Sequence, residues 1–363
     1  MKRAETGERV PTITGSVSLV ADKSDATENY LEITMKMETL QSITLASAMV
    51  LSSACVAAPA KSDRVPGASD GTMYAYESDA SGFHTKNFFY DNGSEVVVFD
   101  TQFTPELAQK SIDFIRMKTS NPITTVVITH PNPDKFNGIS VFQRLGAKVI
   151  ASRKTVDSMA GVHAYKKFFF VAMAKMFSEE TYPQLASVDV VFNQTYDLRL
   201  QNGEVITLRE LSQPGISSNQ TIALVPGAHA VVVGDLVHHR AHAWLEGGIV
   251  DGKPSPSIQG WISDLAEIQR LTRDAPETLL YGGRGEVANA REAIEAQIAY
   301  LRKADQIVEQ YIAKLGARKS ELQGDRAGEH YQALQATFEK AFPSYGLGYL
   351  IQYGVYGLVN SKR

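Results

Sequence analysis

A polar stretch of ten residues, Thr129 to Gly138, constrains the fold of this chain more than any other feature. It follows an apolar, β-branched run over 123–128, which predicts a buried strand, and it precedes 139–145, which predicts a short amphipathic helix. A polar turn between a strand end and a helix start is where α/β proteins carry their catalytic and binding side chains. We therefore predict that the functional site is built around this turn.

The remaining pattern alternates strand-rich segments with α/β segments. Strands are predicted at 72–77, 83–90, 95–100, 147–151, 188–192, 196–200, 205–209, 221–225 and 230–235. Helices are predicted at 104–117, 165–177, 258–273, 286–315 and 327–342. Asn92–Gly93 and Pro226–Gly227 are typical of hairpin turns. Two β-rich halves with helices outside them predict an α/β fold, an αβ/βα four-layer sandwich.

Five motifs, in this order, resemble the metallo-β-lactamase superfamily over roughly residues 72–300. They correspond to an early strand ending in Asp-Thr, the HxHxDH loop, the Gly-His-Thr-Pro-Gly-Ser turn, the Gly-Asp strand end and the Pro-Gly-His-Gly turn. The matching residues are 97–101, His130 with Asp134 and Gly138, 213–219, 233–237 and 280–285. The resemblance implies a fold of the metallo-β-lactamase type.

The same resemblance implies two zinc ions held by five histidines and two aspartates, which activate a bridging water. Only His130, Asp134 and Asp235 match that ligand set. The four other histidine positions are occupied by Asn132, Lys135, Ser212 and Arg284. For Ser212 and Arg284 the alignment holds to within one residue. Lys135 and Arg284 would place fixed positive charge beside the two carboxylates. We predict a metal-free or at most a single-metal site, with His130, Asp134 and Asp235 as ligands of any zinc that binds.

A cluster of histidines follows Asp235 and complicates that prediction. In a helical turn, His239 and His242 would face the same side. They would then serve as replacement metal ligands, as general bases or as substrate contacts. The alternative is that they are structural or surface histidines.

Two apolar segments have alternative interpretations. The stretch 165–177 is either core or a dimer contact, or it is a lid or wall that recognises an apolar substrate group. Tyr345, Tyr349, Tyr353 and Tyr356 would share one helix face, either packing on the core or a dimer contact, or forming an apolar tunnel or membrane-surface contact.

Residues 39–60 are uncharged and end in Ala58-Pro59-Ala60, which is typical of a signal peptide. We predict an upstream or disordered segment at 1–34, a signal peptide at 35–60, a main domain at 61–320 and a C-terminal helical extension at 321–363. The protein would then be periplasmic or secreted, or lipid-anchored through Cys55, the only cysteine. A net charge of −4 gives no electrostatic case for binding nucleic acid, and no membrane span is expected in the mature protein.

The expected function is a hydrolase-like activity on an ester, lactone or related acyl bond of a small-molecule substrate. Asp134 or a nearby histidine would activate water, with His130 and Asp235 beside it, and Lys135 and Arg284 would stabilise the oxyanion. Substrate contacts are predicted for Asn132, Ser212, His239 and His242. One alternative is a non-catalytic binding or relay protein. Another is a mono-metal hydrolase that uses His239 or His242 with the two aspartates.

Overall fold

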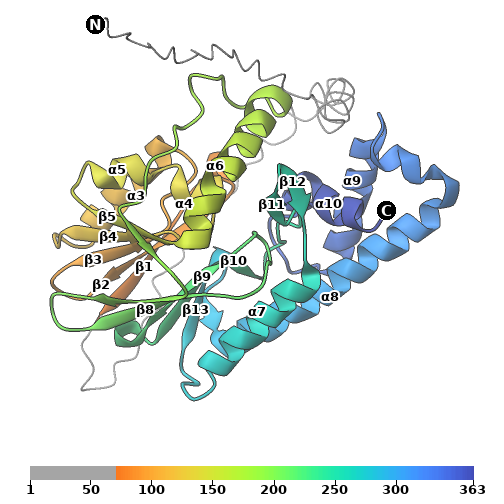
Figure 1. The fold of residues 1–363 in the computed structure, drawn as a ribbon. Coiled ribbons are helices and arrows are strands. Elements are labelled where there is room, and N and C mark those ends of the chain that lie inside the picture. Colours follow the sequence, from red (N-terminus) through yellow and green to blue (C-terminus); the bar gives the residue numbers. More distant parts are fainter. Residues whose placement is uncertain (1–70) are drawn as a thin grey trace, which may run out of the picture.

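The computed structural model describes residues 71–363 and contains two six-stranded sheets packed face to face (Figure 1). The predicted signal peptide, its upstream segment and Cys55 lie outside these residues. Helices cover the outer face of each sheet, so the order of layers is helix, sheet, sheet, helix. This arrangement confirms the predicted four-layer sandwich.

The first sheet runs in chain order and turns from antiparallel to parallel pairing at its centre. Its strands are β1 (Thr72–Glu77), β2 (Lys86–Asp91), β3 (Val96–Phe99), β4 (Ile123–Val127), β5 (Lys148–Ser152) and β6 (Val190–Phe192). Gly93, at φ +88°, forms the predicted turn between β2 and β3. The parallel strands β3 and β4 end at one edge, and the polar stretch Thr129–Gly138 begins there.

The second sheet has the order β14-β13-β10-β9-β8-β7. Its strands are β7 (Thr195–Arg199), β8 (Val205–Glu210), β9 (Thr221–Val225), β10 (Ala230–His239), β13 (Leu279–Gly285) and β14 (Ala288–Asn289). A two-stranded ribbon, β11 (Gly248–Val250) with β12 (Lys253–Ser255), lies beside it. Strands β10 and β13 are parallel, and their register shifts near the ends that approach the first sheet.

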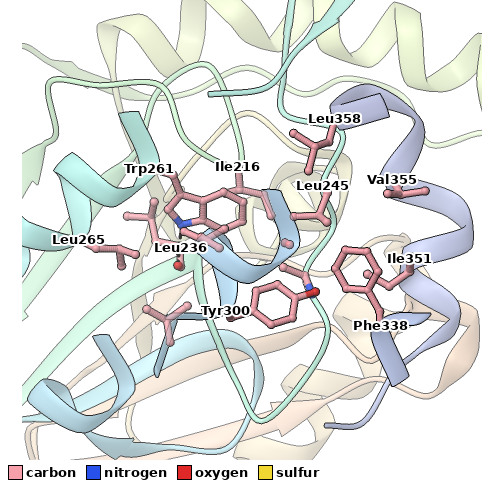
Figure 2. Packing of buried hydrophobic residues seen from close by; sticks show 14 of the residues in the cluster. Ile216, Leu236, Leu245, Trp261, Leu265, Tyr300, Phe338, Ile351, Val355 and Leu358 are labelled. Carbon is pink, nitrogen blue, oxygen red and sulfur yellow. Dashed lines mark hydrogen bonds between the residues drawn. The ribbon is translucent and has the colours of Figure 1, made fainter. Parts of the chain in front are cut away.

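The outer layers are amphipathic helices. On the first sheet lie α3 (Pro105–Arg116), α4 (Pro133–Phe136), α5 (Ile139–Gln143) and α6 (Arg153–Phe168). On the second lie α7 (Ile258–Leu271) and α8 (Ala290–Leu315), followed by α9 (Ala327–Ala341) and α10 (Tyr349–Ser361). The C-terminal helices contribute Phe338, Ile351, Val355 and Leu358 to the same core as Trp261 on α7 (Figure 2). Among residues 71–363, no helix is both long enough and apolar enough to cross a membrane.

Three predictions about individual elements were wrong. Helix α6 starts at Arg153, where the Ser152 hydroxyl accepts a hydrogen bond from Thr155 N, and it ends in a π-helical turn at Phe169–Met173 instead of running to 177. Helix α8 starts at Ala290, four residues later than expected, because the Asn289 side chain caps it. The segment after Asp235 is no helical turn, because β10 continues to His239.

Candidate functional site

The polar stretch meets two neighbouring strands of the second sheet, β10 and β13. Asp134 and Lys135 lie on the short helix α4, Asp235 lies on β10 and Arg284 lies on β13. The stretch is fixed to the end of β3, because Thr101 N and Thr101 Oγ1 both donate to the Lys135 carbonyl, at 2.9 and 2.7 Å. The fold therefore brings residues from three separate elements, 150 positions apart at the extreme, to one place.

These four side chains, which we call the charged quartet, each contact both groups of opposite charge. Lys135 Nζ lies 3.0 Å from Asp134 Oδ2 and 2.7 Å from Asp235 Oδ1. Arg284 Nη2 lies 3.1 Å from Asp134 Oδ2, and Arg284 Nη1 lies 2.7 Å from Asp235 Oδ2. Two positive and two negative charges thus form a closed set that bridges the two sheets.

The quartet is buried, so its members stay ionised only because they contact one another. Burial opposes ionisation of Asp134 and Asp235, but Lys135 and Arg284 outweigh it and hold the pKa of Asp134 below, and that of Asp235 well below, the usual range. Burial likewise opposes the charge of Lys135 and Arg284, and the two carboxylates raise the pKa of both. All four groups are therefore charged at neutral pH.

Two residues outside the predicted site, Phe83 and Thr85, hold Arg284 in place. Its Nε donates to the Phe83 carbonyl at 2.8 Å, and its Nη2 donates to Thr85 Oγ1 at 2.8 Å. Thr85 Oγ1 in turn donates to Asp134 Oδ2 at 2.9 Å. Phe83 and His84 both have left-handed backbone conformations, which are rare for such side chains and are often found at functional sites.

His130 is oriented by a chain of hydrogen bonds behind the quartet. Thr129 N and Oγ1 donate to the Asp100 carboxylate, each at 2.9 Å, and Thr129 Oγ1 lies 2.9 Å from His130 Nδ1. The Thr129 hydroxyl donates its proton to Asp100, so its oxygen can only accept a hydrogen bond from His130. We therefore place a proton on His130 Nδ1, which donates to the Thr129 hydroxyl oxygen. His130 Nε2 then faces Asp235 Oδ2 at 3.7 Å. Burial raises the pKa of Asp100 to about 6.

His238, for which the sequence predicted no role, approaches the quartet from the other side. Its Nε2 lies 3.8 Å from Asp235 Oδ1, while its Nδ1 donates to the His242 carbonyl at 3.1 Å. Strand alternation would place residues 235 and 238 on opposite faces. They share a face because the register shifts: β10 advances from Gly234 to His238 while β13 advances only from Gly282 to Arg284.

The quartet opens onto a pocket. Asp134, Asp235 and Arg284 line it together with Asn132 and Pro133 from the polar stretch. The other lining residues are Phe83, Phe103, Lys166, Phe170 and Trp244. The space inside this pocket is about 30 Å³, which is room for about one water molecule. Phe170 comes from the apolar segment for which a pocket wall was one of the two interpretations.

Three predicted substrate contacts lie away from this pocket. Ser212 is exposed on the loop before Pro214. His239 is buried at the end of β10, with Nε2 3.8 Å from Glu292 on α8. His242 packs among the rings of Tyr300, Phe338, Phe342 and Tyr345, where burial lowers its pKa to about 4. Neither His239 nor His242 has a contact with Asp134 or Asp235 among the interactions of the described residues.

The residues present do not fit the zinc ions that the resemblance implies. Zinc requires donors with free lone pairs at about 2.0–2.3 Å. The Asp235 oxygens are instead engaged by Lys135 and Arg284, an ammonium and a guanidinium that offer no lone pair. Within residues 71–363, no three His, Cys, Asp or Glu side chains are arranged to hold a metal ion.

Comparison with known proteins places the chain in a family. The family model described as "Metallo-beta-lactamase superfamily" (Lactamase_B) matches residues 82–284, more than half of the chain. No curated protein sequence matches it.

Among solved structures, a metallo-beta-lactamase from Pontibacter korlensis is 16% identical, with a TM-score of 0.47, and the match covers 66% of this chain and 97% of that one. FIM-1 from Pseudomonas aeruginosa, in a mono-zinc form, is 15% identical, with a TM-score of 0.46 and coverage of 64% and 91%. The enzyme from Hirschia baltica is 15% identical, with a TM-score of 0.45 and coverage of 65% and 95%. On the family model, this chain belongs to the metallo-beta-lactamase superfamily.

Proposed function

We propose that this chain is a hydrolase that acts on an ester, lactone or related acyl bond and uses its own charged groups in place of zinc. The observation that carries the proposal is the charged quartet, three of whose members line the pocket. A buried set of ion pairs adds little to stability compared with apolar side chains of similar size. Perturbed ionisable groups in a pocket wall are typical of a catalytic site.

Asp134 is the best placed of the four to activate water. Its side chain is 10% exposed, the most of the quartet. Its Oδ2 accepts from Arg284 and Thr85 and forms an ion pair with Lys135 at 3.0 Å, whereas its Oδ1 has no hydrogen bond among the described residues. Asp134 Oδ1 would take the proton of a water held in the pocket. Arg284 and Lys135 would stabilise the negative charge that develops on the acyl oxygen.

The low pKa of Asp134 sets a limit on this chemistry. A carboxylate that binds its proton weakly is a weak general base at neutral pH, so we expect slow turnover. For the same reason the carboxylate stays ionised in mild acid. The rate should therefore persist below the pH at which an ordinary aspartate becomes protonated, about 3.9.

A second candidate is a binding protein without catalysis. The observation that favours it is that each cation already contacts two carboxylates. An oxyanion would have to compete with those carboxylates for Lys135 and Arg284. A neutral ligand could occupy the same pocket without this competition.

Metal content and turnover, measured on the same protein, test the proposal. The full chain is purified without chelator, and one half is treated with chelator. Both halves are assayed for zinc and on a panel of esters and lactones. We expect turnover that does not depend on zinc and that Asp134→Asn abolishes, with the exposed Asp274→Asn as control. Stoichiometric zinc with chelator-sensitive turnover would overturn the proposal. No turnover at all would leave the binding protein as the better reading.

A further inference from the structure

A second buried ion pair lies in the pocket wall, outside the quartet. Lys166 on α6 pairs with Glu246, and both side chains are almost fully buried. The Lys166 ammonium also lies over the Trp244 ring, 5.2 Å from its centre, and over the Tyr165 ring at 5.7 Å. Lys166 lines the pocket. The proposed chemistry gives this pair no role.

The two partners differ in how completely they are bonded. Glu246 Oε2 accepts from Lys166 and, at 2.9 Å, from Trp244 Nε1, while its Oε1 accepts from the Tyr356 hydroxyl. Lys166 has three N–H donors. Its only hydrogen bond among the described residues goes to Glu246. The ammonium therefore has donors left over on a wall that a ligand would touch.

Aromatic rings separate this ion pair from the quartet. The Phe83 ring lies edge-on to Trp244 at 5.8 Å and to Phe103 at 5.4 Å, and Phe103 meets Phe170 at 4.9 Å. Arg284 is bonded to the Phe83 carbonyl on one side, and Lys166 covers Trp244 on the other. A ligand that reaches from the quartet to Lys166 would thus cross a belt of ring edges and faces.

The formal charges around the pocket cancel. Lys135, Lys166 and Arg284 are matched by Asp134, Asp235 and Glu246, each cation in direct contact with a carboxylate. No cation in this set is left to balance an anionic ligand. Since removing an ion from water is costly without a partner charge, an anionic ligand would bind poorly here.

We propose that the pocket takes an uncharged ester or lactone with an aromatic or similarly flat apolar group. That group lies within the aromatic belt, and an oxygen at its far end accepts a hydrogen bond from Lys166. This inference rests on the proposed function and deepens it by naming the class of substrate.

A molecule of this size needs more room than the 30 Å³ of the pocket. Tyr353 on α10 is the side chain best placed to yield. Its ring stacks on Trp244 with a 9° angle between the planes, and it remains 43% exposed. Moving this ring aside opens the Trp244 face without breaking a hydrogen bond of the quartet or of Glu246.

Two amide probes of matched shape test the inference on the full chain. 4-Acetamidobenzamide is neutral and has a carbonyl oxygen at its far end, and 4-acetamidobenzoate has the same shape with one negative charge. Calorimetry should show 4-acetamidobenzamide binding at least about tenfold more tightly than 4-acetamidobenzoate, a difference of about 1.4 kcal/mol. Glu246→Gln leaves Lys166 uncompensated, so it should shift the ratio of the two affinities by at least about tenfold toward the anion. Lys166→Met should weaken 4-acetamidobenzamide, because it removes the donor to the far-end oxygen, and Lys166→Met/Glu246→Gln, which restores neutrality, should keep the preference for the neutral probe.

Turnover of phenyl acetate separates this inference from the proposed function. If phenyl acetate is hydrolysed but 4-acetamidobenzoate binds as tightly as 4-acetamidobenzamide, or neither probe binds, the inference is overturned and the proposed function stands. If neither probe binds and phenyl acetate is not hydrolysed, both are overturned. An unchanged preference in Glu246→Gln would also overturn the inference. Should that variant not fold, Lys166→Met and Lys166→Met/Glu246→Gln differ by the same change at residue 246, and the ratio of the two affinities should shift toward the anion between them.

Discussion

Lys135 is a lysine with no exposed surface, and two carboxylates provide all of its ionic contacts within the quartet. Removing an ammonium from water costs several kcal/mol, and the cost is met only when good partners surround it. Loss of one partner should therefore be worse than loss of a balanced pair. This gives a direct test of whether the four charges act as a unit.

Lys135→Met should lower the free energy of unfolding by about 3–5 kcal/mol, because it leaves two buried carboxylates with one cation. Lys135→Met/Asp134→Asn should cost less than the single change, since one cation then faces one carboxylate. Denaturant unfolding of both variants gives the comparison.

Lys154→Met is a matched control for that comparison. Lys154 Nζ pairs with Glu210 at 2.7 Å, but its side chain is 58% exposed. We expect a loss of at most about 1 kcal/mol. If Lys135→Met/Asp134→Asn is less stable than Lys135→Met, the four charges of the quartet do not act as a unit.

The position of Lys135 between two carboxylates also makes a prediction about zinc. Lys135→His would replace a cation by a neutral donor next to Asp134, Asp235 and His130. We expect a higher zinc affinity than in the unsubstituted chain, measured by calorimetry. Exposed Lys148→His serves as the control. Equal affinity in the two variants would mean that residue 135 does not govern metal binding.

The sequence predicted which charged residues come together, because each stands in or beside a recognisable motif. It gave no role to Thr85 or His238. Thr85 reaches the site through its hydroxyl group, from a loop without a motif. His238 reaches it through a register shift that simple alternation does not contain. Ser212, aligned to a histidine position in a motif, lies on an exposed loop instead.

At the level of elements, two glycines on neighbouring strands make room for the quartet and the histidine behind it. A Cβ at Gly283 on β13 would lie 1.8 Å from Asp235 Oδ1. A Cβ at Gly234 on β10 would lie 2.5 Å from Thr129 Oγ1, and this residue has φ +53°. Both strands therefore need a missing side chain where they pass the site.

Gly283→Ala should destabilise the protein by about 1–3 kcal/mol or more, because Asp235 must move away from its partners. Gly161→Ala is the control, since a Cβ at this position on α6 would meet nothing within 4 Å. That change should stabilise the helix by up to about 1 kcal/mol. Thermal unfolding of both variants compares them, and equal stability would contradict the crowding at Gly283.

Strand positions were predicted better than helix limits. Strands such as β3 and β4 are short apolar runs with a clear end. Helix α6 was missed over most of its length because its mixed face hides the helical period, although Ser152 and Thr155 form a cap at its start. The glycines of α10 weakened the prediction of a helix there. They allow close contact: a Cβ at Gly357 would lie 2.2 Å from the Glu246 carbonyl oxygen.

At the level of the whole molecule, buried groups outside the quartet set the response to pH. Burial raises the pKa of Asp264 on α7 to about 7. Its Oδ1 accepts from Gln213 N at 3.1 Å, and its Oδ2 has no partner among the described residues. A carboxyl group with a raised pKa contributes stability that is complete below its unfolded pKa, about 3.9, and is lost as the pH rises through the folded pKa. Lowered pKa values, as in Asp235, act in the opposite direction.

Asp264→Asn should remove the loss of stability that Asp264 causes as the pH rises through its folded pKa. Its melting temperature relative to the unsubstituted chain should rise as the pH increases from about 5 to about 8. The exposed Asp274→Asn should show no such trend. A parallel pair of melting curves across that range would mean that Asp264 does not ionise within it.

The charged quartet joins the two halves of the sandwich, and every charge in it belongs to the polypeptide. A bound ion has an occupancy that depends on its concentration in the surroundings and on competing chelators. The quartet has no such dependence on concentration or chelators, since its two cations are present once per folded chain whatever the medium contains. Its formation is a step of folding, and the ways to lose it are unfolding and protonation.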